Sequence, residues 1–314
     1  MRPNASFYNI HEVGYYLTPN RDAIDYLRLT MLSRASIIVD MNKLSIERRA
    51  RILSCLCEGN SVRATCRMTN SSKDAVLKLV ADAGAACLEY QREHLRNLPC
   101  KRVQCDEIWS FVYAKAKNVP AEFQGQFGYG DVWTWTAIDA DTKLVPCWLV
   151  GTRGAEAAIT FMRDLASKLA NRVQLTTDGH NVYLNAVDAA FDREIDYAML
   201  VKRYGSAPET EVRYSPAICL GCDKTELRGR PDPKHISTSY VERQNLNMRM
   251  GMRRFTRLTN AFSKKLDNHR HAISLFYMYY NFGRIHQTLR VTPAMAAGVS
   301  DHVWSMEEIA GLVP

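Results

Sequence analysis

The sequence lacks a long apolar run, a low-complexity tract and an internal repeat. Its most apolar N-terminal stretch, residues 24–39, is interrupted by Asp25, Arg28 and Arg34, so we expect no transmembrane helix. A basic segment followed by an apolar one, as in a signal peptide, is also missing from the N-terminus. These absences predict a cytoplasmic protein that has no membrane partner.

Paired cysteines are scarce. Of the nine cysteines, only Cys219 and Cys222 form a CxxC pair, and no second pair completes a zinc site. Scattered thiols are typical of reduced cysteines that pack as small hydrophobic side chains. We therefore expect no structural zinc, and the pattern leaves the role of the CxxC pair open.

The composition is that of a globular protein, with 46% apolar and 24% charged residues among 314. This length allows one large domain or two ordinary ones. The net charge is +8, and it is unevenly distributed. Residues 101–200 carry 10 basic and 13 acidic side chains, whereas residues 1–100 carry 14 and 10, and residues 201–314 carry 17 and 10. An acidic centre between basic ends favours a metal-dependent enzyme that acts on a polyanion such as DNA.

Residues 1–40 form an N-terminal extension that differs from the rest of the chain. The segment is aromatic and irregular at first, and a short helix is possible over residues 22–33. Met41 then opens a segment with regular helical spacing. Two interpretations remain open, a natural start at Met41 or a genuine N-terminal arm that begins at Met1.

Residues 41–98 are predicted to be entirely helical. Ser45, Ser61 and Ser72 are suitable caps for three successive helices, Gly59 ends the first, and residues 69–71 form a turn before the third. A helix, a short helix, a tight turn and a further helix make up the helix-turn-helix plan, in which the last helix enters the major groove of DNA. An ordinary helical bundle would show the same pattern.

If the helix-turn-helix interpretation is correct, the helix that begins near Ser72 is the recognition helix. Lys73 and Lys78 are then its basic contacts to DNA.

Residues 99–282 are predicted to form an α/β domain with a mixed sheet, because the hydrophobic period changes near residue 100. Within it, residues 203–237 are rich in Gly, Pro and charge and are expected to be an insertion loop. Residues 283–314 are expected to be a C-terminal tail with a short helix that begins at Pro293. The remaining expected elements are strands at 103–113, 128–139, 143–150, 173–177 and 195–201, and helices at 155–170, 181–191, 238–257 and 261–280.

Three acids are the candidate catalytic and metal-binding residues. Asp106 lies among apolar neighbours in a strand, Asp178 ends another strand, and Glu242 lies in the first turn of a helix. We expect them to converge on one edge of the sheet. Convergent carboxylates suit Mg²⁺ or Mn²⁺, and two such ions support in-line phosphoryl transfer.

Each acid taken alone is better explained as a surface or structural carboxylate. Three further acids are nearby. Glu107 should point to the opposite face of its strand from Asp106. Asp139 and Asp141 suit a hairpin turn.

The predicted helix 238–257 continues with arginines. Arg249 and Arg253 fall within about 20° of the face of Glu242, and Arg254 and Arg257 add to the basic surface. A solvated charged face would normally include acids for i,i+4 pairing, but no acid occurs between Glu242 and Asp267. We therefore expect these four arginines to bind DNA phosphates.

The sequence resembles a bacterial DDE transposase of the insertion-sequence-one type. The resemblance runs from about residue 42 to residue 300. It rests on the segments CDEIWSFVYAK, LTTDGHNVY, YVERQNLNMRMGMRRFTRLTNAFSKK and YNFGRIHQTLRVTPAMA, together with the predicted helix-turn-helix. Some relatives carry a cysteine-based zinc module before the helix-turn-helix. No cysteine precedes residue 55 here, so that zinc is not expected.

The resemblance implies a ribonuclease-H-like catalytic domain and an N-terminal helix-turn-helix domain that binds the terminal inverted repeats of the element. It implies Mg²⁺-dependent cleavage and strand transfer into target DNA, with Asp106, Asp178 and Glu242 as the catalytic acids and Arg249 as the basic residue that follows. We expect a homo-oligomer in the synaptic complex. The alternatives are a non-catalytic DNA-binding repressor, an inactivated copy of the transposase, or a nuclease on the same fold.

Overall fold

The computed structural model describes residues 43–205, 218–256 and 260–314. The chain divides into two units, Met1–Ser45 and Ile46–Pro314, and the second is described below. The predicted N-terminal extension, Arg257 and residues 206–217 of the predicted insertion loop lie outside the described residues. Within the described ranges, no helix is both long and apolar enough to cross a membrane.

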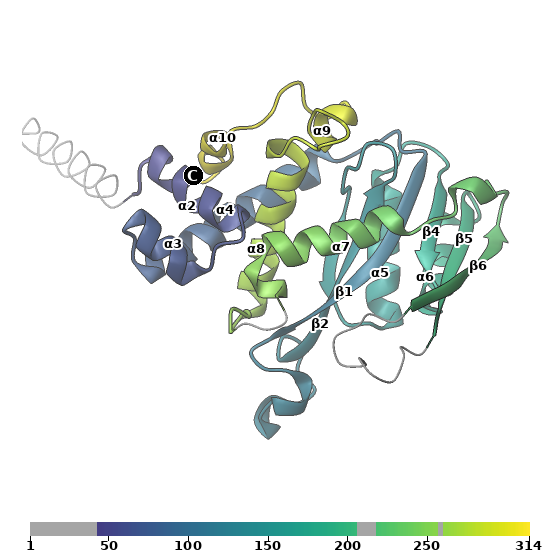
Figure 1. Ribbon diagram of the computed structural model, residues 1–314, viewed down its shortest axis with the longest axis horizontal. Coiled ribbons are helices and arrows are strands. Elements are labelled where there is room, and N and C mark those ends of the chain that lie inside the picture. Colours follow the sequence, from purple (N-terminus) through teal and green to yellow (C-terminus); the bar gives the residue numbers. More distant parts are fainter. Residues whose placement is uncertain (1–42, 206–217, 257–259) are drawn as a thin grey trace, which may run out of the picture. The chain divides into compact units, whose positions relative to one another are not determined.

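A six-stranded mixed sheet forms the centre of the unit Ile46–Pro314 (Figure 1). The strand order is β3-β2-β1-β4-β5-β6. β1 pairs antiparallel with β2 and parallel with β4, which itself pairs parallel with β5. A mixed sheet of this kind is consistent with the ribonuclease-H-like core that the resemblance implies. The strands are β1 (Arg102–Val112), β2 (Gly130–Asp139), β3 (Trp148–Gly151), β4 (Gln174–Asp178), β5 (Asp196–Gly205) and β6 (Ile218–Arg228).

Two strand predictions were wrong. The expected insertion loop 203–237 contains the end of β5 and all of β6, which pairs antiparallel with β5 at the edge of the sheet. Several residues of β6 are charged and it has no buried face, so its sequence shows no apolar alternation. The expected strand 143–150 is shortened to β3. The Asn281 side chain accepts from the Val145 N–H and donates to its C=O, which replaces ladder hydrogen bonds.

Helices cover both faces of the sheet (Figure 1). On one face, Trp135 of β2 contacts Phe161 of α5 (Ala155–Lys168) and Tyr183 of α6 (Val182–Phe191). On the other, Ile108 of β1 packs in one buried cluster with residues of α7 (Ser239–Gly251) and α8 (Leu266–Met278). Alternate residues of β1 therefore face different helical layers.

The predicted N-terminal helices are present as α2 (Ile46–Cys57), α3 (Val62–Thr69) and α4 (Lys73–His94). Ser61 accepts a hydrogen bond from the Ala64 N–H at 3.1 Å, and Ser72 accepts one from the Ala75 N–H at 3.2 Å. Both serines thus satisfy a backbone donor that the first helical turn leaves free, which confirms two of the three predicted caps.

These helices pack directly against the rest of the unit. α4 crosses α8 at Gly84, where an added Cβ would lie 2.4 Å from the His271 carbonyl oxygen. The segment predicted as a C-terminal tail contains α9 (Pro293–Ala296) and α10 (Met306–Gly311), and α10 packs against α2. Residues 46–98 and 283–314 therefore meet in one helical layer.

The two long C-terminal helices are shorter than predicted. α7 ends at Gly251, not at residue 257, and Met252 is extended. An added Cβ on Gly251 would lie 2.9 Å from the Phe276 ring, so the close packing of α8 fixes this end. α8 begins at Leu266 rather than residue 261 and continues into a π turn, Tyr279–Gly283. Short 3-10 turns occupy Ala116–Asn118, Ala121–Phe123, Pro233–His235 and Arg253–Phe255.

Candidate active site

Asp106 and Asp178 lie side by side on neighbouring parallel strands. The pairing of β1 with β4 reaches Cys105 and Thr177, and each aspartate is the next residue along its strand. Residues in register on parallel strands point to the same side of a sheet. A carboxylate oxygen of each belongs to a group, shared with Glu107, whose members all lie within 4.8 Å of one another.

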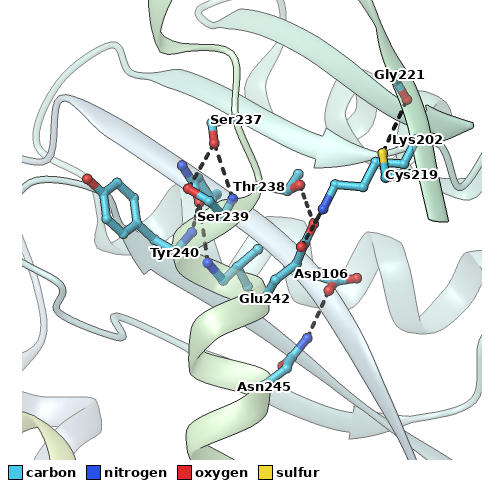
Figure 2. Close-up of polar contacts among 12 residues, drawn as sticks. Asp106, Lys202, Cys219, Gly221, Ser237, Thr238, Ser239, Tyr240, Glu242 and Asn245 are labelled. Carbon is cyan, nitrogen blue, oxygen red and sulfur yellow. Dashed lines mark hydrogen bonds and ion pairs between the residues drawn. The ribbon is translucent and has the colours of Figure 1, made fainter. Parts of the chain in front are cut away.

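The Asp106 carboxylate is held by two neutral donors. Asn245 of α7 donates through Nδ2 to Oδ2 at 2.8 Å (Figure 2), and the Glu107 N–H donates to Oδ1 at 2.8 Å. Burial, together with repulsion from Asp178 and Glu107, raises the pKa of Asp106 to about 7.

Neither aspartate has a cationic partner. Across the described ranges, no Lys or Arg forms an ion pair with Asp106 or Asp178. Two close carboxylates without a counter-charge are an arrangement that a bound cation would stabilise.

Glu107 lies nearer to this pair than the sequence suggested. Its partners do lie on the opposite face from Asn245, as strand alternation predicts: Arg153 donates to Oε1 at 2.8 Å and the Tyr183 hydroxyl donates to Oε2 at 3.1 Å. One of its oxygens nevertheless belongs to the same close carboxylate group. Both oxygens are already engaged, and the side chain is 1% exposed.

Gln104 fixes the start of α7 over the sheet. Its Oε1 accepts hydrogen bonds from the N–H groups of Tyr240 at 2.8 Å and Val241 at 3.3 Å. Gln104 lies two residues before Asp106 on the same face of β1. This contact therefore brings the first turn of α7, and Glu242 with it, to the edge where the aspartates lie.

The Glu242 carboxylate is directed toward β5. Lys202 of β5 donates to both of its oxygens, and the Thr238 hydroxyl donates to Oε1 at 2.6 Å (Figure 2). Glu242 lines the same cleft as Asp106 and Asp178, which has a volume of about 560 Å³. The structure thus brings the three predicted acids to one cleft, with Glu242 paired to a lysine and the aspartates unpaired.

The donor set of the cleft fits a hard divalent cation. Its potential ligands are carboxylate oxygens, which suit Mg²⁺ or Mn²⁺. Burial is the main cause of the raised pKa of Asp106, and repulsion from Asp178 and Glu107 adds to it, so a bound cation would favour the ionised carboxylate.

The predicted arginines do not form a continuous stripe. Arg249 is exposed on α7, as expected, but Arg253 follows the end of the helix and so leaves the face of Glu242. Arg254 is half-buried and donates to the Ser263 hydroxyl at 2.7 Å, because its side chain turns toward the protein. Arg257 lies outside the described residues.

Lys73 and Lys78 are both exposed on α4. Lys73 occupies the first turn, whereas Lys78 pairs with Asp82 at 2.7 Å, which offsets its charge.

Sequence reasoning overlooked Gln104, Lys202 and Asn245. The available signal was spacing: Gln104 lies two residues before Asp106 on a strand, and Asn245 lies three residues after Glu242 on a helix.

Comparison of the sequence with protein-family models and with curated proteins gives no match. Among solved structures, the chain is similar to the piggyBac transposase synaptic complex with hairpin DNA, with a TM-score of 0.36, 11% identity, and coverage of 84% of this chain and 70% of that chain. It is also similar to the Mos1 mariner paired-end complex with Mn, with a TM-score of 0.20, 13% identity, and coverage of 59% and 60%. Both TM-scores are too low to assign a function to this chain.

Proposed function

We propose that this chain is a DNA transposase of the DDE superfamily, of the bacterial insertion-sequence-one type. The observation that carries the proposal is the meeting of Asp106, Asp178 and Glu242 in one cleft, where no described Lys or Arg forms an ion pair with either aspartate. These are the three acids that the sequence resemblance implies. The reaction would be hydrolysis of a DNA phosphodiester, followed by attack of the freed 3′ hydroxyl on target DNA.

Asp106, Asp178 and Glu242 are the residues that would hold Mg²⁺ or Mn²⁺, with two ions expected. When bound, such ions activate the attacking oxygen and stabilise the leaving one. Asn245 holds Asp106 in one orientation, and Thr238 does the same for Glu242. These neighbours orient two of the three carboxylates before substrate arrives, whereas Lys202 would compete with a metal for Glu242.

The two segments predicted from the sequence would have different roles. Residues 41–98 would bind the terminal inverted repeats as a helix-turn-helix, with Lys73 and Lys78 at phosphates. Residues 99–282 would carry the chemistry, with Arg249 and Arg253 contacting DNA. Transposition joins two element ends, so we expect a homo-oligomer in the synaptic complex.

An in vitro strand-transfer assay on labelled element ends tests this function. We expect cleavage and joining in Mg²⁺ or Mn²⁺, and none in EDTA. The Asp178→Ala protein should bind the same DNA in EDTA but should not cleave it when metal is added. Activity that persists in EDTA or in the Asp178→Ala protein would refute the proposal.

A further inference from the structure

A second concave surface lies between the N-terminal helices and the segment that joins α7 to α8. It has a volume of about 820 Å³, and we call it the basic groove. One wall comes from the end of α2 and the starts of α3 and α4, and the other from residues 252–254, residues 260–265 and α8. The cations that line it are Arg63, Lys73, Arg253, Arg254, Lys264 and Lys265.

The charge of the basic groove is uncompensated. Asp and Glu are absent from the described residues that line it. In the part of the chain that the structure describes, none of the six cations forms an ion pair with a carboxylate. Five of them are exposed and Arg254 is half-buried. Like charges gathered in one concavity repel each other, so the surface gains most from a ligand with several negative charges.

The two walls are joined by close backbone contacts. Gly59, with φ of +80°, ends α2 where an added Cβ would lie 2.9 Å from the Met250 carbonyl oxygen of α7. Arg254 is anchored through Ser263, whose hydroxyl hydrogen-bonds His269 Nδ1 at 2.9 Å. With the crossing at Gly84, these contacts fix the two walls and Arg254 relative to each other before a ligand binds.

We propose that the basic groove binds the sugar–phosphate backbone of duplex DNA, so that α3, α4 and residues 252–254 and 260–265 hold a single duplex. This inference rests on the proposed function, because it takes DNA as the substrate of the cleft. α7 links the two surfaces: Glu242 lies at the cleft, and Gly251 ends the helix beside the groove, about 14 Å further along the axis. A DNA strand advances about 3.4 Å per nucleotide. The phosphates in the groove therefore lie roughly four to six nucleotides from the phosphate that is cleaved.

The test uses a B-form duplex of arbitrary sequence, because phosphate contacts do not depend on sequence. The double variant Lys264→Gln/Lys265→Gln is compared with Lys115→Gln/Lys117→Gln, which removes two exposed lysines outside the groove and the cleft. Binding is measured in EDTA over a series of salt concentrations, after equal thermal stability of the three proteins has been shown. For the groove variant, we expect the slope of log affinity against log salt concentration to decrease by about two, and the affinity to fall at least tenfold. The affinity of the control variant should change less than about threefold.

A groove variant that binds like the control would overturn the inference while leaving the proposed function intact. A wild-type protein without salt-dependent duplex binding would overturn both. The number of nucleotides between the groove and the cleaved phosphate is tested separately, with methylphosphonate linkages placed along an element-end duplex. Neutral linkages four to six nucleotides from the cleaved bond should weaken binding of the wild type but not of the groove variant. Equal weakening of both proteins would contradict the placement.

Discussion

Lys202 of β5 donates hydrogen bonds to both carboxylate oxygens of Glu242 of α7 (Figure 2). Partial burial lowers the pKa of Lys202, but the hydrogen bond and the charge of Glu242 outweigh that effect, so the net pKa is raised. Lys202 therefore stays protonated and balances the third acid. The aspartate pair carries the uncompensated charge of the cleft.

Replacement of Lys202 by Gln should tighten divalent-metal binding. The substitution releases Glu242 from its ion pair and removes one positive charge from the cleft. A unit charge about 4 Å away near a protein surface is worth on the order of 1–4 kcal/mol, so we expect a gain of roughly tenfold in Mn²⁺ affinity. Free Mn²⁺ measured by electron paramagnetic resonance gives this directly.

The matched control is Lys224→Gln, which removes the same charge from β6, where Lys224 donates to the Pro233 carbonyl outside the cleft. Equal Mn²⁺ affinities for the two variants would show that Lys202 does not compete for Glu242.

Metal-free stability should fall as pH rises through neutrality. The pKa of Asp106 in the folded protein is about 7, against an ordinary value of 3.8. Its protonated form therefore stabilises the fold fully below about pH 4, and this contribution is lost as pH rises through 7. In EDTA at pH 8, Asp106→Asn should raise Tm by several degrees, because it removes an ionised carboxylate whose rise in pKa from 3.8 to about 7 costs roughly 4 kcal/mol. At pH 4 the two proteins should melt together. A lower Tm for Asp106→Asn at pH 8 would contradict this account.

Asn245 should set the pH at which metal binds. Its Nδ2 donates to Asp106 at 2.8 Å and favours the ionised carboxylate. Asn245→Ala removes that donor, so the pKa of Asp106 should rise and the midpoint of Mn²⁺ binding should move up by roughly one pH unit. Asn247→Ala, which loses only a bond to Gln244 on the same helix, is the control. Superimposable pH profiles for the two variants would remove Asn245 from the site.

The α4–α8 contact should be intolerant of a single methyl group. An added Cβ at Gly84 meets His271 backbone and Cβ atoms at 2.4–2.6 Å, so the helices must separate. Gly84→Ala should cost about 1–3 kcal/mol in the free energy of unfolding. Gly311→Ala, where no heavy atom lies within 4 Å, should cost far less. Denaturant unfolding of both variants measures the difference, and equal losses would show that the crossing can adjust.

Local signals in the sequence predicted much of the fold. Ser61 and Ser72 mark helix starts because their hydroxyls satisfy backbone donors within three residues. The alternation of β1 and β2 follows from burial against helices on both faces. The convergence of Asp106 and Asp178 was predicted from a residue within one strand and a residue at the end of another, whereas their matching register on parallel strands is known only from the structure.

The features that could not be predicted depend on contacts between residues distant in the sequence. α7 ends at Gly251 because Phe276 packs there, and Arg254 turns inward because the Ser263 hydroxyl, itself hydrogen-bonded to His269, accepts its hydrogen bond. The direction of Glu107 along β1 was predictable. Its closeness to Asp178 was not, because that depends on how the end of β4 meets β1.

Metal binding by Asp106, Asp178 and Glu242 is the basis of the proposed function, and it is tested most directly by finding which acids metal binding requires. Mn²⁺ binding and DNA cleavage are to be measured for Asp106→Asn, Asp178→Asn, Glu242→Gln and Glu107→Gln. The first three should each lose metal affinity by tenfold or more and cleavage by at least about a thousandfold. Glu107→Gln should keep both within about tenfold, because Arg153 and Tyr183 already occupy its oxygens. Loss of function in Glu107→Gln, with Glu242→Gln retaining activity, would show that the metal lies on Asp106, Glu107 and Asp178 and would contradict the assignment of Glu242.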